Sequence, residues 1–140
     1  MNIDIREMII EDYPQAYELW RSIEGMKLET ADSKDGVEKY LLRNPGMSYV
    51  AICNDRVIGT ILCGEDGRRG YMQHLCVKKE FRGRGIGGDL IERSLSAFKN
   101  AGLHEVRIFI FKSNVLGNKY WDKKGWITRD DIHVKAIDLE

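Results

Sequence analysis

The feature that most constrains this chain is a glycine-rich segment at residues 82–88, which follows an apolar run at residues 72–77 and opens an amphipathic helix. Its residues are Arg82, Gly83, Arg84, Gly85, Ile86, Gly87 and Gly88. Glycines let the backbone approach a ligand closely and turn several N–H groups toward one point. The start of a helix adds about half a positive charge at that point. Because two arginines also lie in the segment, it predicts a binding site for a pyrophosphate.

One pattern in this segment is that of dinucleotide-binding proteins. Residues 83–88 fit G-x-G-x-x-G, which is a weak signal without its structural context. A nicotinamide site needs these glycines in the first strand-to-helix turn and an acid about 20 residues later for the ribose. Here the glycines follow several strands that we expect to form hairpins. The next strand is followed by Lys112 and Ser113, neither of which is the acid that a ribose needs. A nicotinamide cofactor is therefore the weaker interpretation.

A second pattern joins two segments of the chain. Residues 82–87 fit R-x-x-G-x-G and follow the apolar residues 75–77, which resembles the acetyl-CoA-binding signature of the GNAT superfamily of N-acetyltransferases. Residues 114–126 resemble the second signature of that family, N-x-x-A-x-x-x-Y-x-x-x-G-F, with Asn114, Gly125 and the aromatic residue after it in register. The order and length of the expected elements extend this resemblance over nearly the whole chain.

Length and composition set the broad class of the protein. The chain has 140 residues, 43% hydrophobic and 31% charged, which is typical of one globular domain over residues 1–140. Lys and Arg together number 22, as do Asp and Glu, so no overall charge favours nucleic acid or a membrane surface. No apolar run approaches the ~20 residues of a membrane span, and the first residues lack the apolar core of an export signal. We expect a cytoplasmic protein with neither kind of partner.

The three cysteines, Cys53, Cys63 and Cys76, lie far apart, each in an apolar strand. This pattern indicates reduced, buried cysteines. Because the chain has no C-x-x-C pair, we expect no metal site. Cys76 lies in the strand expected to bind the cofactor, where packing is favoured over a role as acyl carrier.

The hydrophobic pattern predicts an α/β fold with the order β-α-α-β-β-β-α-β-α-β-β. The expected strands cover residues 3–8, 49–53, 57–63, 71–77, 106–111, 126–128 and 132–139. Residues 106–111 are apolar at every position but one, which predicts a central strand buried on both faces. The resemblance implies a GNAT-like, mixed and mostly antiparallel sheet of about seven strands with four helices.

The resemblance also implies a reaction, transfer of an acetyl group from acetyl-CoA to a primary amine. Pantetheine would insert between the strands at residues 72–77 and 106–111, with its pyrophosphate on the glycine-rich segment. A backbone N–H near Cys76 or Val77 would stabilise the oxyanion. The residues implied for cofactor binding are Leu75, Cys76, Val77, Arg82, Gly83, Arg84, Gly85, Ile86, Gly87, Gly88, Asn114 and Trp121. For Asn114, a helix N-cap is the alternative or additional role.

The proton donor departs from the family pattern. The usual Tyr, seven residues after the Asn, is Trp121 in this chain, and Tyr120 lies one residue earlier. One residue turns a side chain by about 100° around a helix, so Tyr120 does not simply inherit the geometry. An indole N–H donates a hydrogen bond but gives up no proton. We favour Tyr120 over Trp121 as the general acid, and packing against the sheet is the alternative for both.

The general base is less well defined. Some relatives carry a Glu five residues before the Asn, where this chain has Phe109. Histidine is the side chain whose ordinary pKa lies nearest neutrality, and His74 is the best remaining candidate, against a purely structural role. Strict alternation places His74 with Met72 and Cys76 on one face of its strand. A water chain with no dedicated base would also serve an α-amine, whose pKa is about 7.7 to 8.0. Weaker candidates are Glu24, Glu29 and His133.

Two functions stay open at this point. The leading one is an acetyl-CoA-dependent N-acetyltransferase, and the alternative is a non-catalytic module that binds acyl-CoA as a sensor. The acceptor is a small-molecule or peptide amine that these residues do not identify, although acids in the loop at residues 24–34, such as Asp32, would suit a cation. Either a monomer or a homodimer is compatible with the sequence.

Overall fold

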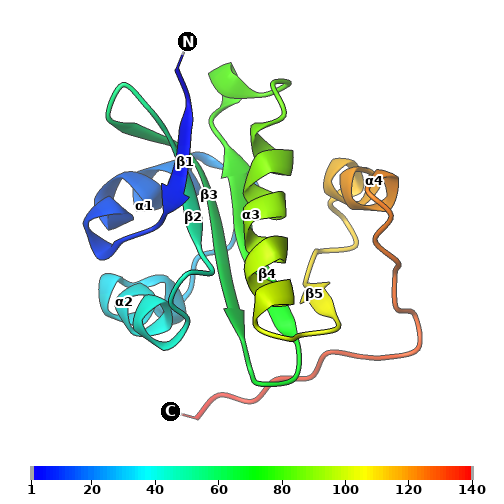
Figure 1. Ribbon diagram of the computed structural model, residues 1–140. Coiled ribbons are helices and arrows are strands. Elements are labelled where there is room, and N and C mark those ends of the chain that lie inside the picture. Colours follow the sequence, from blue (N-terminus) through cyan, green and yellow to red (C-terminus); the bar gives the residue numbers. More distant parts are fainter. Residues whose placement is uncertain (1, 140) are drawn as a thin grey trace. The chain divides into compact units, whose positions relative to one another are not determined.

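The computed structural model describes residues 2–139, and the chain forms two compact units, Met1–Phe109 and Ile110–Glu140. The first unit contains a β-sheet and three α-helices, and the second contains one α-helix (Figure 1). No helix within residues 2–139 has both the length and the apolar content that a membrane crossing requires.

The first unit is built on a five-stranded sheet in the order β1-β2-β3-β4-β5. Its strands are β1 (Asp4–Glu7), β2 (Tyr49–Cys53), β3 (Arg56–Glu65), β4 (Gly70–Val77) and β5 (Val106–Ile108). All neighbouring strands pair antiparallel except β4 and β5, which are parallel. The mixed, mostly antiparallel sheet is thus confirmed, whereas the expected number of about seven strands is wrong.

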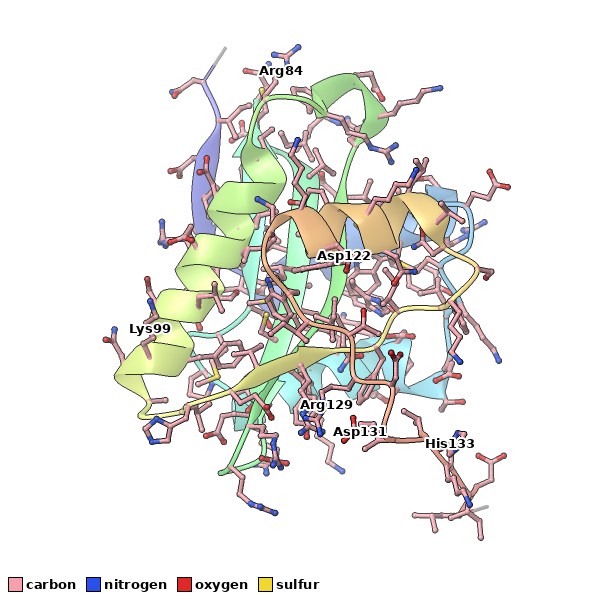
Figure 2. All side chains as sticks on the ribbon, turned by 90° about the vertical axis from the view of Figure 1, so that its right-hand side faces the viewer. Arg84, Lys99, Asp122, Arg129, Asp131 and His133 are labelled. Atoms are coloured by element: carbon pink, nitrogen blue, oxygen red, sulfur yellow. The ribbon has the colours of Figure 1, made fainter. Side chains whose placement is uncertain are left out.

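The two missing strands are those of the hairpin expected at residues 126–139. A two-residue hairpin turn of the common type needs positive φ at both central residues. Asn54 and Asp55 adopt such angles, 49° and 62°, and their hairpin forms as predicted between β2 and β3. In the last segment the carboxylate of Asp131 instead binds the guanidinium of Arg129 at 2.9 Å, and Figure 2 shows the two side chains together. Residues 126–139 contain no strand in the structure.

Three helices cover the two faces of the sheet. They are α1 (Tyr13–Ser22), α2 (Lys34–Arg43) and α3 (Ile86–Asn100). On β3, Thr60 accepts a hydrogen bond from Trp20 of α1, and a Cβ placed on the preceding Gly59 would lie 3.3 Å from Leu90 of α3. Successive strand residues point to opposite faces, so α1 and α2 lie on one face and α3 on the other (Figure 1). β3 is accordingly buried along almost its whole length.

The fifth strand is shorter and less buried than its apolar pattern predicts. β5 ends at Ile108, its residues are half-buried, and it forms the edge of the sheet. Its ladder with β4 ends at the pair Met72 and Ile108. The prediction of a central strand over residues 106–111 is therefore wrong, because an apolar run alone does not distinguish an edge strand from a central one.

A β-bulge interrupts β4. Gln73 faces Leu62 of β3 and Cys76 faces Thr60, so the two residues between them, His74 and Leu75, oppose a single residue of β3. His74 has a φ of 50°, which lies in the left-handed region. The bulge changes the face to which the following residues point.

This bulge contradicts the strict alternation expected for residues 71–77. Gly70 faces α3, because a Cβ there would contact Phe98, and Met72 shares that face by alternation. Cys76 instead lies beside Thr60 on the α1 face, with its Sγ 3.3 Å from the hydroxyl oxygen. Met72 and Cys76 therefore point to opposite faces, and His74 lies on the α1 face with Cys76.

The second unit contains the helix α4 (Val115–Lys123), as the sequence predicts. Asn114 is its N-cap, and the side-chain oxygen accepts a hydrogen bond from the N–H of Gly117 at 2.9 Å. A Cβ at Gly117 would collide with the Asn114 side chain in this arrangement. The glycine at the position where the family signature has alanine thus accommodates the cap.

Candidate active site

The glycine-rich segment forms a tight connection from β4 into α3. Gly83 and Gly85 have φ values of 79° and 80°, a conformation that residues with a Cβ adopt at a cost. Gly85 is the N-cap of α3, and its carbonyl accepts a hydrogen bond from the N–H of Asp89 in the first turn of the helix. In an α-helix the N–H groups of the first turn have no carbonyl partner within the helix, so those at the start of α3 can bind an anion.

Two arginines lie in this connection. Arg82 donates from its Nε to the carbonyl of Val77 at 2.9 Å, which ties the segment to the end of β4. Arg84 places its guanidinium 5.6 Å from the centre of the Phe81 ring. Figure 2 shows Arg84 at the end of α3 where the helix begins, far from Lys99 near the other end. The positive side chains thus add to the positive end of the helix.

The backbone of β4 has no strand partner on its β5 side over residues 73–77. The ladder with β5 joins Gly70 through Met72 only, within the part of the chain that the structure describes. The implied cofactor-binding residues Leu75, Cys76 and Val77 lie in this stretch, directly before the glycine-rich segment. An exposed strand edge can accept an extended ligand as an additional strand. The resemblance implies that pantetheine inserts between these two strands, and the ladder that joins them ends before this stretch.

The bulge brings His74 against two residues from other elements. Its Nε2 lies 2.6 Å from Oδ1 of Asp32, which ends the short 3-10 helix Thr30–Asp32. Its ring packs on that of Trp20, with 4.7 Å between ring centres. The side chains of His74 and Asp32 are 12% and 10% exposed, so the pair is shielded from bulk water but not sealed from it.

Cys76 is packed in the core of the first unit. Its thiol is buried and contacts the hydroxyl of Thr60. Burial raises the pKa of this thiol to about 11, so at neutral pH it carries its proton and is a poor nucleophile. All three cysteines are free and buried, as the sequence predicts. The geometry supports the packing interpretation of Cys76 over the acyl carrier.

Three other candidate residues lie in the second unit: Asn114, Tyr120 and Trp121. Trp121 packs edge-on against Trp126, with ring centres 4.7 Å apart, and against Tyr120 at 5.5 Å. Partial burial raises the pKa of Tyr120, so its hydroxyl is a weaker acid than that of an exposed tyrosine. Asn114 is occupied as the cap of α4. These three residues are thus held in place by contacts within the second unit.

Sequence reasoning missed the two residues that fix His74. The sequence indicates Asp32 only as one of several acids in the loop at residues 24–34, and it gives no sign that Trp20 contacts His74. Asp32 is 42 positions from His74 in the sequence. The β-bulge that turns the His74 ring toward Asp32 has no characteristic residue type that would reveal it in the sequence. No local pattern in the sequence indicates the pair.

Residues 5–126 match the Acetyltransferase (GNAT) family, and the chain belongs to this family. It is therefore an acyltransferase that uses acetyl-CoA. Its sequence is 32% identical to N-alpha-acetyltransferase 30 of Schizosaccharomyces pombe over 68% of this chain and 70% of that protein. It is 28% identical to an acetyltransferase of Pectobacterium atrosepticum over 93% of this chain and 92% of that one.

The fold has a solved counterpart. The PaiA N-acetyltransferase of Thermoplasma acidophilum, whose crystal structure is a complex with coenzyme A, superposes with a TM-score of 0.82. The match covers 94% of each chain at 22% sequence identity. At this identity the likeness establishes the GNAT-like α/β fold.

Proposed function

We propose that this acyltransferase is an N-acetyltransferase, in which a primary amine attacks the thioester of acetyl-CoA directly. The observation that carries the proposal is the left-handed pair Gly83 and Gly85 at the start of α3, placed after a β4 edge without a strand partner. Acetyl-CoA supplies an activated acetyl group. The chain must bind it, stabilise charge on the reacting carbonyl oxygen and handle protons.

Binding falls to the glycine-rich segment and the β4 edge. The backbone N–H groups of Ile86, Gly87 and Gly88 would bind the pyrophosphate, and Arg82 and Arg84 would add charge-assisted hydrogen bonds. The free edge at residues 73–77 would pair with the amides of pantetheine as an added strand. A backbone N–H at Cys76 or Val77 would donate to the thioester oxygen, which gains negative charge as the amine attacks.

Proton transfer is assigned to two residues. His74 is the proposed general base, supported by its placement on the bulge and by a partner at its Nε2. Tyr120 is the proposed general acid for the departing sulfur, supported by its hydroxyl, which lies one residue before the position where the family signature has Tyr. Asn114 would contact the cofactor or order the start of α4, and Trp121 would line the same site. A thiol has a pKa of about 8.5, so the sulfur of coenzyme A can leave as a thiolate. Proton donation by Tyr120 would therefore assist this step without being essential to it.

The acceptor is an amine of a small molecule or a peptide. The relative in Schizosaccharomyces pombe is named as an N-alpha-acetyltransferase, which makes peptides with a free α-amine the first acceptors to test. An α-amine has a pKa of about 7.7 to 8.0, so part of it is already neutral at physiological pH. We propose a monomer or homodimer in the cytoplasm as the working state.

A thermal-shift series tests cofactor binding. The purified protein is melted with acetyl-CoA, free coenzyme A or NADH, beside a Gly85→Glu variant. If Kd is about 10 μM, 1 mM ligand stabilises the protein by roughly 2.7 kcal/mol, which is on the order of 5–10 °C in Tm. The proposal expects this shift with both coenzyme A species, no shift with NADH and no shift in the variant. Absence of a shift with acetyl-CoA would overturn it.

The acyl-CoA sensor is the competing function. Membership of the acetyltransferase family favours turnover over binding alone. The two differ in one observable, because only an enzyme releases coenzyme A faster when an amine is added.

A further inference from the structure

The contacts around Asp32 are more extensive than a loop acid requires. Its Oδ1 meets Nε2 of His74 at 2.6 Å, and its Oδ2 accepts the backbone N–H of Glu29 at 2.9 Å. The backbone carbonyl of Asp32 accepts the hydroxyl of Tyr13 of α1 at 2.7 Å. Both carboxylate oxygens and the carbonyl are therefore engaged, which leaves the carboxylate a single orientation toward the ring.

His74 is held equally firmly from its own side. Its backbone carbonyl accepts the hydroxyl of Thr60 at 2.8 Å, and the same hydroxyl oxygen accepts Nε1–H of Trp20 at 2.9 Å. Trp20 in turn packs its ring on the imidazole. The ring is thus fixed by a hydrogen-bonded bulge beneath it and an aromatic face beside it, and its geometry does not depend on the carboxylate alone.

The chemistry of the pair fixes the tautomer of the ring. An ionised carboxylate only accepts hydrogen bonds, so the hydrogen must lie on Nε2 of His74. In a neutral imidazole the other nitrogen, Nδ1, then carries the lone pair. Within residues 2–139 every buried side-chain nitrogen and oxygen has a partner, and no described residue bonds to Nδ1. Nδ1 is therefore not among the fully buried atoms of the described residues.

We propose that Asp32 is a positioning residue that holds His74 as the Nε2–H tautomer, so that Nδ1 receives the proton of the acceptor amine. This inference rests on the proposed function. The nitrogen lone pair of the amine forms the new C–N bond, and the C–S bond breaks with its electron pair leaving on the sulfur of coenzyme A. The amine proton passes to Nδ1 and from there to solvent. Two other titratable groups lie next to the pair: Tyr13, whose hydroxyl donates to the Asp32 carbonyl, and Cys76, which contacts Thr60.

A purely structural pair would also join the loop before α2 to β4, so the test must read the tautomer itself. The substitution Asp32→Asn does so. The Oδ2 position must still accept the Glu29 N–H, so the amide oxygen takes that position and the amide NH2 faces Nε2. Nε2 then has to accept, and the hydrogen moves to Nδ1. The matched control is Asp35→Asn, the same change at an exposed acid in the first turn of α2.

The first measurement is the ¹⁵N spectrum of the imidazole in the full chain at a pH where the ring is neutral. The wild type and Asp35→Asn are expected to show Nε2–H, and Asp32→Asn to show Nδ1–H. The spectrum of the wild type stands on its own if the Asp32 variant fails to fold. An Nδ1–H tautomer in the wild type overturns the inference.

The second measurement is the pH profile of kcat/KM with a peptide α-amine as acceptor. The rate is measured from the release of coenzyme A. Asp32→Asn is expected to lose about 10²- to 10⁴-fold in kcat/KM, the range of general base catalysis, with the thermal shift by acetyl-CoA retained. Wild-type kcat/KM in a folded Asp32→Asn protein with the Nδ1–H tautomer overturns the inference while the proposed function survives. If no amine in a panel is acetylated, the proposed function fails, and the proton-transfer role fails with it whatever the tautomer.

Discussion

At the scale of single residues, the backbone conformation of two glycines explains why the segment before α3 has its composition. Gly83 and Gly85 adopt φ near 80°, where a side chain is strained even though a Cβ would meet no neighbouring atom. The requirement is therefore conformational and not one of space. The sequence indicated this segment correctly, because positive φ at closely spaced positions leaves a visible mark in glycine content.

Replacing Gly85 tests this requirement. We expect Gly85→Ala to lose about 1–2 kcal/mol of stability through left-handed strain and to weaken acetyl-CoA binding, since the N–H groups of the helix start move. Gly67→Ala is the control, because Gly67 has a φ of 89° and also meets no atom within 4 Å, but lies in the turn between β3 and β4. Urea unfolding and calorimetric titration measure the two effects. Equal coenzyme A affinity in both variants would contradict the assignment.

Tyr120 allows a second test at this scale. A tyrosine hydroxyl has an ordinary pKa of about 10 and keeps its proton at neutral pH, and burial raises the pKa of Tyr120 further. We expect Tyr120→Phe to reduce kcat by about 10²-fold, the lower end for a general acid, with Kd for acetyl-CoA unchanged. Trp121→Phe replaces the indole by a smaller aromatic ring without an N–H, so it controls for a change in packing next to Tyr120. A Tyr120→Phe protein with wild-type kcat would show that the sulfur leaves without this proton.

At the scale of elements, β4 shows where sequence reasoning stops. Its extent and its place before the glycine-rich segment followed from the apolar run, but the bulge at His74 and Leu75 did not, because alternation assumes one residue per position of the partner strand. The predictions of a longer β5 and of a final hairpin were wrong for a related reason. Strand length and strand pairing both depend on the neighbouring strands, which a local sequence pattern does not specify. The Asn54–Asp55 hairpin succeeded because its turn residues specify their own φ angles.

The hydroxyl that secures the bulge gives a test of this element. Thr60→Val keeps the shape of the side chain and leaves the Trp20 N–H and the His74 carbonyl without the buried hydroxyl, which costs about 1–3 kcal/mol. We also expect kcat/KM to fall, because the ring of His74 loses its support. Ser48→Ala removes another buried hydroxyl, which bonds only the backbone of Cys63, and should lower stability alone. Equal kcat/KM in the two variants, measured beside urea unfolding, would refute this role of the bulge.

At the scale of the whole molecule, the family match spans residues 5–126 and thus parts of both compact units. The single domain over residues 1–140 stays a prediction. The sequence identified the family and the cofactor because both are carried by short, local motifs. It could not identify Asp32 as the partner of His74, since that contact joins residues 42 positions apart.

The buried titratable groups predict how stability depends on pH. Burial raises the pKa of Cys76 to about 11, and of Cys63 and Tyr40 to about 12. The folded protein therefore keeps protons that the unfolded chain releases from about pH 9 upward, so stability is full below pH 9 and falls as the pH rises toward 11. Chemical unfolding at pH 8, 9 and 10 measures the slope.

A variant that removes one of these groups checks the cause. Cys76→Ala should show a shallower alkaline loss of stability, whereas Val57→Ala, which truncates a side chain of the same core cluster without removing a proton, should keep the wild-type slope. Parallel slopes for the two variants would rule out the thiol as a source of the pH dependence.

The most direct test of the central claim is amine-dependent release of coenzyme A. The purified protein is incubated with acetyl-CoA and a panel of amines that includes peptides with a free α-amine, and the free thiol and the acetylated product are measured together. The account predicts that at least one amine is acetylated in equal amount to the coenzyme A released, and that His74→Gln reduces this rate while acetyl-CoA still binds. Tight binding of acetyl-CoA with no acetylated amine in the panel would contradict it, and would indicate a sensor.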